Sequence, residues 1–207
     1  MTTTTNRRNF IKATAMAGLG FSILPSHIAF SRDSATKVRL GFIGVGFRGQ
    51  SHLELALKRN DVEVVALCDI QQSMMEMSLQ MVSKANKPKP TVILDGPWGY
   101  RKLLESKDID AVIISTPWEW HSVMCLDSMN AKKYVGCEVN VGMTVEECWE
   151  LVHTSERTGM PLMMLENVCY RRDVMAVLNM VRQNIFGELV HLQGGYQHDL
   201  RGVKFND

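Results

Sequence analysis

The sequence predicts an α/β fold: a doubly wound parallel sheet over residues 37–170, then the start of a second, α+β domain over residues 171–207. Three observations predict it. Short apolar runs alternate with helical patterns, as in a parallel sheet covered on both faces. A glycine-rich turn, G-x-G-x-x-G, joins the first apolar run to the first helical pattern. Beyond residue 170 the alternation gives way to one amphipathic helix and a half-polar, glycine-broken run.

The expected strands cover residues 38–43, 62–68, 91–94, 110–115, 134–138 and 161–166, and the expected helices residues 50–58, 71–84, 100–106, 119–130 and 144–158. Thr144 and Glu147 have the spacing of a capping box at the start of the last helix, and Gly159 is its expected stop. A helix over 173–184 and a strand over 188–197 would begin the second domain. Because one helix and one strand cannot bury a core, we expect the chain to be the N-terminal part of a longer enzyme.

The glycine-rich turn at residues 44–49 predicts a dinucleotide site of the Rossmann type. Gly44 permits the tight turn, Gly46 lets the backbone approach a pyrophosphate, and Gly49 allows the helix to pack closely on the strand. The pyrophosphate would then lie at the free N–H groups of the helix. A glycine-rich turn that binds nothing is the alternative interpretation.

Asp69 favours NAD as the cofactor. It ends the second expected strand, twenty residues after Gly49. A carboxylate at that place accepts hydrogen bonds from the ribose hydroxyls of the adenosine half, and its charge would repel a 2′-phosphate. The sequence therefore predicts NAD rather than NADP.

Other candidate site residues follow the later strands, because ligands of open α/β sheets bind at the carboxyl ends of strands. Two tryptophans, a glutamate and a histidine follow the fourth strand, a density that favours cofactor contact over simple coverage of the core. The candidates are Trp118, Glu119, Trp120 and His121 after the fourth strand, Glu138 and Val139 after the fifth, and Asn167 after the sixth.

Residues 1–31 read as a bacterial twin-arginine export signal rather than as part of the fold. Arg7 and Arg8 precede Phe-Ile-Lys and a mildly hydrophobic stretch that is too short to span a bilayer as a mature helix. We therefore expect the twin-arginine machinery as a partner, a periplasmic location and no stable membrane span. A disordered basic tail on a cytoplasmic protein is the alternative.

Composition limits the remaining classes of partner. A formal net charge of +1, with no basic patch interleaved with aromatics, argues against nucleic acid. The five cysteines have no metal-binding spacing, so we expect neither a metal nor a disulfide. The methionines of the second helix, Met74, Met75, Met77 and Met81, are expected to pack in the core.

The sequence resembles the glucose–fructose oxidoreductase and inositol dehydrogenase superfamily and, more narrowly, glycoside hydrolase family 109, the NAD-dependent α-N-acetylgalactosaminidases. The stretches GFIGVGFRGQSH, PWEWH, GCEV, TVEECW, LENVCYRRDVMAVLNMVRQ and GGYQHDLR carry the resemblance. It implies a glycosidase that uses NAD in a cycle of oxidation, elimination, addition and reduction on terminal α-N-acetylgalactosaminides. A glycoside is then the small-molecule substrate, and we expect a homo-oligomer.

The resemblance also implies roles for individual residues. Phe47 and Arg48 would contact the pyrophosphate, and the candidates after the fourth, fifth and sixth strands would line the nicotinamide side. Tyr196 would contact the sugar. His198 lies two residues further on, so in a strand it faces the same way and is a candidate catalytic acid or base; a surface histidine is the alternative.

Val139 departs from the wider superfamily, whose dehydrogenases usually carry Glu-Lys-Pro where this chain has Glu138-Val139-Asn140. Valine cannot transfer a proton, so an ordinary dehydrogenase on the common plan is disfavoured. An NAD-dependent sugar oxidoreductase with its base elsewhere, and a non-catalytic NAD-binding fragment, stay open as alternatives.

Overall fold

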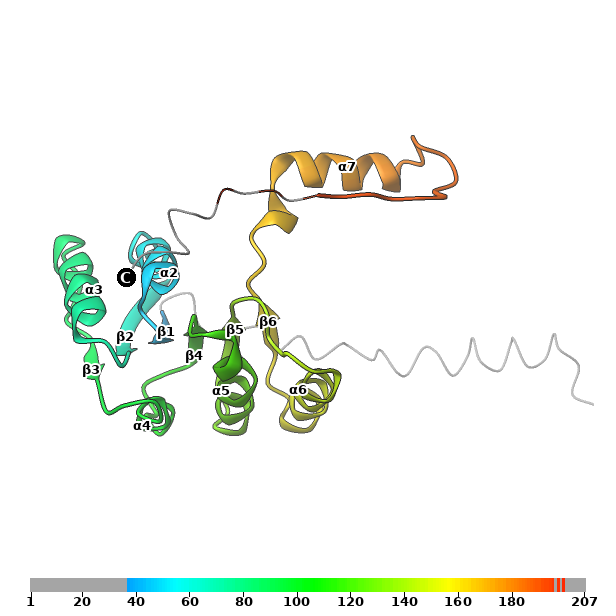
Figure 1. Cartoon of the computed structure of the whole chain (residues 1–207). Helices are drawn as coiled ribbons and strands as arrows, with labels where there is room; N and C mark the ends of the chain where they lie inside the picture. Colours follow the sequence, from blue (N-terminus) through cyan, green and yellow to red (C-terminus); the bar gives the residue numbers. More distant parts are fainter. Residues whose placement is uncertain (1–36, 196, 198, 200–207) are drawn as a thin grey trace, which may run out of the picture.

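The computed structural model describes residues 37–195, 197 and 199 (Figure 1). The expected export signal lies outside these residues, as do Tyr196 and His198. None of the helices in the described ranges is long and apolar enough to span a bilayer.

A six-stranded sheet of order β3-β2-β1-β4-β5-β6 forms the centre of the fold, and all neighbouring strands are parallel. Its strands are β1 (Val38–Ile43), β2 (Val62–Cys68), β3 (Thr91–Ile93), β4 (Ala111–Ile114), β5 (Tyr134–Cys137) and β6 (Leu162–Met164). All six strands and the doubly wound α/β arrangement are thus confirmed.

Helices cover both faces of the sheet (Figure 1). On one face lie α2 (Phe47–Leu57) and α3 (Gln72–Lys84); on the other lie α4 (Tyr100–Leu104), α5 (Trp118–Asn130) and α6 (Val145–Thr158). Side chains of successive strand residues point to opposite faces, so Phe42 packs with Leu53 and Met75 under α2 and α3. Ile43 belongs to the other cluster, with Met124 and Leu151.

The predicted capping box of α6 is present. Glu147 N–H donates to Thr144 Oγ1 at 3.2 Å, and Thr144 N–H donates to Glu147 Oε2 at 3.1 Å. Gly159 ends the helix in the left-handed region, with φ of 69°. The other helix starts differ from the expected ones by at most one residue, but α2 begins at Phe47, three residues before the expected 50. The reason is that Gly46 already has the extended backbone of an N-cap residue.

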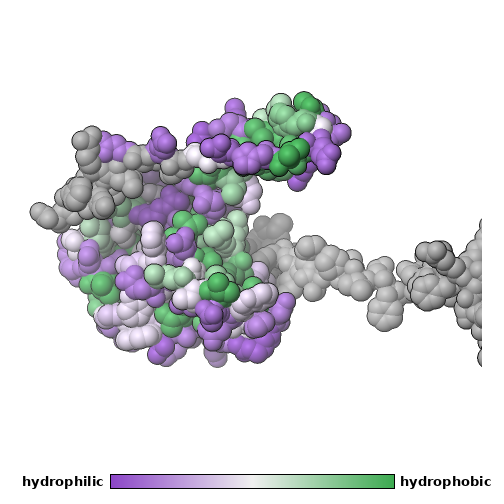
Figure 2. Space-filling view, turned by 45° about the vertical axis from the view of Figure 1, so that its right-hand side comes forward, coloured by the Kyte–Doolittle hydropathy of each residue, from purple (hydrophilic) through white to green (hydrophobic). Residues whose placement is uncertain are grey.

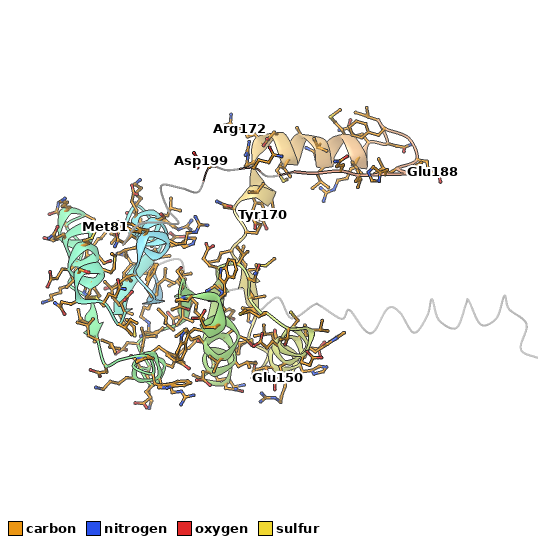
Figure 3. All side chains as sticks on the ribbon, viewed as in Figure 1. Met81, Glu150, Tyr170, Arg172, Glu188 and Asp199 are labelled. Carbon is orange, nitrogen blue, oxygen red and sulfur yellow. The ribbon has the colours of Figure 1, made fainter. Side chains whose placement is uncertain are left out.

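After β6, a 3-10 turn (Val168–Tyr170) leads into α7 (Arg172–Arg182), which stands away from the sheet and has no buried residue (Figure 1). The 3-10 turn, α7 and the described segment that follows form an arm. Tyr170 and Arg172 lie at the base of this arm and Glu188 at its far end (Figure 3). Hydrophobic surface gathers on the arm (Figure 2), where Val177, Phe186 and Val190 are exposed.

The strand predicted over 188–197 is a correction. The described residues of this range, 188–195 and 197, have no strand structure, although they run back beside α7 (Figure 1). Val190 is 92% exposed. A strand needs a neighbouring strand to satisfy its backbone hydrogen bonds, and no described strand lies beside this segment.

Candidate functional site

A cavity of about 260 Å³ opens at the carboxyl edge of the sheet, where the strand order reverses between β1 and β4. The glycine-rich turn, the end of β2 and the start of α5 surround it. Its lining residues include Gly44, Gly46, Asp69, Ile70, Met74, Pro97, Tyr100, Ser115, Thr116 and Trp120.

The three glycines of the turn have different surroundings. Gly44 has φ of +85°, and a Cβ there would lie 2.7 Å from the carbonyl oxygen of Ser115. A Cβ on Gly49 would lie 2.1 Å from the carbonyl oxygen of Gly44, so α2 can approach β1 only without a side chain at this position. A Cβ on Gly46 would meet nothing within 4 Å. A side chain would therefore clash at Gly44 and at Gly49, whereas the space beside Gly46 is open.

The carboxylate of Asp69 supports this turn. Val45 N–H donates to Oδ2 at 2.6 Å, and Gln71 N–H donates to Oδ1 at 2.8 Å. Each carboxylate oxygen has a further lone pair, and Asp69 lines the cavity. Burial, and then the charge of Asp69, raise the pKa of the neighbouring Cys68 thiol to about 12, so that thiol stays protonated.

Glu138 is the centre of a charged cluster on the other side of β4. Only 8% of the residue is exposed. Arg48 Nε and Nη2 each lie 2.7 Å from Glu138 Oε1, and His52 Nε2 lies 2.5 Å from the same oxygen. Two residues of the first turns of α2 thus hold the carboxylate that follows β5.

His121 is 1% exposed and lies between two backbone carbonyl groups. Its Nδ1 is 2.7 Å from the oxygen of Asn140, and its Nε2 is 2.8 Å from that of Thr116. Burial disfavours a charged ring, but the contact with Cys137 and the two carbonyl oxygens outweigh it, so the pKa of His121 lies above its usual range. The Cys137 thiol is kept neutral, since its hydrogen bond to Cys125 and its burial raise its own pKa. The two carbonyl oxygens also favour the charged form, in which both ring nitrogens donate.

Two aromatic residues, Tyr100 and Trp120, line the cavity on the α4 and α5 side. Trp98 meets Trp120 edge to face, with ring centroids 5.0 Å apart, and Arg101 Cζ lies 4.3 Å from the Trp98 ring centroid. Tyr100 Oη donates to Asp127 at 2.7 Å. The edge contact packs Trp120, which lines the cavity, against Trp98, which does not.

The predicted site residues divide between two places. Gly44, Gly46, Asp69 and Trp120 line the cavity, whereas Arg48 and Glu138 pair with each other across α2 and β5. Phe47, Trp118, Glu119 and Asn167 are exposed, and Val139 is half-buried. Contact of any of these residues with a cofactor stays a prediction. His121 is buried with both ring nitrogens occupied, so in this structure it positions two loops.

Sequence reasoning missed His52, Met74 and Tyr100 as residues of these two places. His52 could have been found, because it lies four residues after Arg48 and so on the same helix face. Met74 was expected in the core with its neighbours; Met75 is buried there, but Met74 lines the cavity and Met77 is exposed. Among the described residues no group of histidine, cysteine and carboxylate side chains could hold a metal ion.

These residues fit a dinucleotide. The open backbone at Gly46 leaves room for a pyrophosphate at the start of α2, where the first N–H groups have no acceptor within the helix. The Asp69 carboxylate retains acceptor capacity toward the cavity, as a ribose diol requires.

Comparison with known proteins gives two family matches. Residues 38–166 match the oxidoreductase family with an NAD-binding Rossmann fold, and residues 170–207 match the C-terminal domain of glycosyl hydrolase 109. A glycosyl hydrolase family 109 protein of Stenotrophomonas maltophilia is 53% identical over 202 residues, which are 97% of this chain and 44% of that protein. An α-N-acetylgalactosaminidase of Tannerella forsythia is 46% identical over an alignment of 219 positions, which covers 97% of this chain and 47% of that protein.

Solved structures share the fold. A scyllo-inositol dehydrogenase of Lactobacillus casei with bound NAD(H) and scyllo-inositol superposes with a TM-score of 0.65 at 17% identity, over 74% of this chain and 43% of that one. An NAD-binding protein of Listeria innocua gives a TM-score of 0.62 at 25% identity, over 74% and 42% of the two chains. The chain spans less than half the length of the curated relatives described above. It belongs to the oxidoreductase family with an NAD-binding Rossmann fold and to glycosyl hydrolase family 109.

Proposed function

We propose that this chain provides the NAD-binding part of a glycosidase that hydrolyses terminal α-N-acetylgalactosaminides. The observation that carries the proposal is the 46% identity to an α-N-acetylgalactosaminidase, which extends through 97% of the chain. That span includes the glycine-rich turn, Asp69 and the Arg48–Glu138 pair, so the whole candidate site lies within it.

The cofactor is NAD. The cavity at the glycine-rich turn takes the adenosine half, and the start of α2 takes the pyrophosphate. Asp69 accepts hydrogen bonds from the ribose hydroxyls and repels a 2′-phosphate. When bound, NAD supplies reversible hydride transfer, so that a sugar can be oxidised, lose its aglycone by elimination, add water and be reduced without net consumption of NAD.

The carboxylates near the site support this redox route over ordinary glycoside hydrolysis, which needs two positioned carboxyl groups, one of them as acid. Glu138 is already paired with Arg48 and His52. Glu166 accepts a hydrogen bond from Val168 N–H at 2.9 Å, and Glu119 is exposed. We assign positioning of the sugar to Tyr196 and proton transfer to His198, both in the family 109 domain match.

The test is cleavage of a chromogenic α-N-acetylgalactosaminide by the complete gene product, in deuterated water, before and after removal of NAD. We expect aglycone release only with NAD, no build-up of NADH, and deuterium at C2 of the released sugar, because elimination removes the C2 proton. Cleavage after complete removal of NAD would overturn the proposal. NADH accumulation with a free sugar would support a sugar oxidoreductase instead, and NAD binding without turnover would support a non-catalytic fragment.

We also propose that the protein is exported folded by the twin-arginine route, on the pattern of residues 1–31. Changing Arg7 and Arg8 to lysine should leave the precursor in the cytoplasm. Unchanged delivery to the periplasm on cell fractionation would contradict this.

A further inference from the structure

The hydroxyl of Ser115 has no hydrogen-bond partner, although its oxygen is buried; it is the one side-chain atom of this kind in the part of the chain that the structure describes. A buried polar atom without a partner destabilises the folded state, because it has given up its hydrogen bonds to water. Native structures keep such an atom when it serves a ligand or a bound water.

Ser115 lies where β4 passes the glycine-rich turn. Its N–H donates to the carbonyl oxygen of Ile43 at 2.9 Å, which places it beside Gly44. Its carbonyl oxygen is the atom that a Cβ on Gly44 would strike, and its Cβ lies 3.7 Å from the position of a Cβ on Gly49. Ser115 also lines the cavity together with Gly44 and Gly46.

The groups around Ser115 limit which hydrogen-bond acceptor its hydroxyl can have. The nearby described carboxylate, Asp69, already accepts two backbone N–H groups and bonds no part of Ser115. The proposed pyrophosphate lies at the open side of the turn, by Gly46. A phosphoryl oxygen of a ligand bound there would be an acceptor for the free Ser115 hydroxyl.

We propose that the Ser115 hydroxyl donates a hydrogen bond to the pyrophosphate of the dinucleotide, directly or through one bound water. This rests on the proposed binding of NAD. The orphaned hydroxyl is then a positioning group that gains its partner only in the complex. The competing explanation is that β4 merely needs a small residue beside Gly44 and Gly49, and in that case alanine serves equally well.

The experiment compares Ser115→Ala with Ser128→Ala. Ser128 is a matched control, since it is also buried but donates to the Met124 carbonyl oxygen at 2.6 Å and does not line the cavity. For each protein we measure NAD affinity by calorimetric titration and the melting temperature without ligand. Ser115→Ala should weaken NAD binding about tenfold and should not lower the melting temperature, because it removes an unsatisfied polar atom. Ser128→Ala should keep its NAD affinity.

Two results overturn the inference while leaving NAD binding intact: unchanged NAD affinity in Ser115→Ala, or weaker affinity together with a lower melting temperature. The second result would show that the hydroxyl supports the fold. A wild-type chain that does not bind NAD would overturn the proposed function, and this inference with it.

Discussion

Two alanine substitutions in the same glycine-rich turn should impair different properties, one the folding of the chain and the other its binding of NAD. A Cβ on Gly49 would lie 2.1 Å from the Gly44 carbonyl oxygen. This is a backbone atom, so no change of side-chain rotamer can relieve the clash. A Cβ on Gly46 would meet nothing within 4 Å, and Gly46 has φ of −64°, which alanine adopts without strain. Gly49→Ala therefore perturbs the packing of α2, whereas Gly46→Ala changes only the space at the start of that helix.

The expected magnitudes follow from these distances. Cβ atoms essentially never approach another heavy atom below 3.0 Å, so α2 must move from β1 by about 1 Å in Gly49→Ala. Overpacking of this kind costs about 1–3 kcal/mol or more of the free energy of unfolding. For a chain of this size the melting temperature falls by roughly 2–4 °C per kcal/mol. Gly46→Ala should leave the free energy of unfolding within about 0.5 kcal/mol of wild type. It should weaken NAD binding, because the methyl group occupies the proposed pyrophosphate position.

The assay is thermal unfolding by circular dichroism, paired with calorimetric titration of NAD for each variant. Gly49→Ala with an unchanged melting temperature would refute the packing argument. Gly46→Ala with wild-type NAD affinity would refute the assignment of the open backbone to a pyrophosphate.

Three further predictions concern charged and titratable groups. Asp69→Ala should weaken NAD binding by about 1.5–3 kcal/mol, and equal affinity of the wild type for NAD and NADP in a titration would remove its basis. The pKa of His121 is raised in the folded state, so its contribution to stability is complete below the unfolded value of about 6.5 and is lost as the pH rises through the folded-state pKa. The fall in melting temperature over that range should therefore be smaller in His121→Gln, and equal pH dependence in both proteins would contradict it. Glu138→Gln leaves Arg48 and His52 without their shared carboxylate and should lower the free energy of unfolding by about 1–3 kcal/mol; chemical denaturation showing wild-type stability would count against this cluster.

The sheet was predictable because its signals are local. Each strand is a short apolar run, and the capping box at Thr144 and the stop at Gly159 are set by neighbouring residues. The strand at 188–197 was wrong for a different reason. Its apolar residues have strand propensity, but a strand also requires a partner strand, and none of the described residues supplies one.

The candidate site was predictable only in part. The glycine spacing and Asp69 led to the cavity because both lie at strand ends, where topology brings them together. The pairing of Arg48 and His52 with Glu138 joins α2 to β5, eighty-six residues apart for the histidine. Such long-range pairs, and the orphaned hydroxyl of Ser115, depend on packing that no sequence motif records.

Calorimetric titration of the purified wild-type chain with NAD, and separately with NADP, tests the central claim most directly. We predict saturable binding of one NAD per chain and much weaker binding of NADP, since Asp69 lines the cavity that would receive the adenosine half. Failure to bind NAD, or equal affinity for the two dinucleotides, would contradict the account.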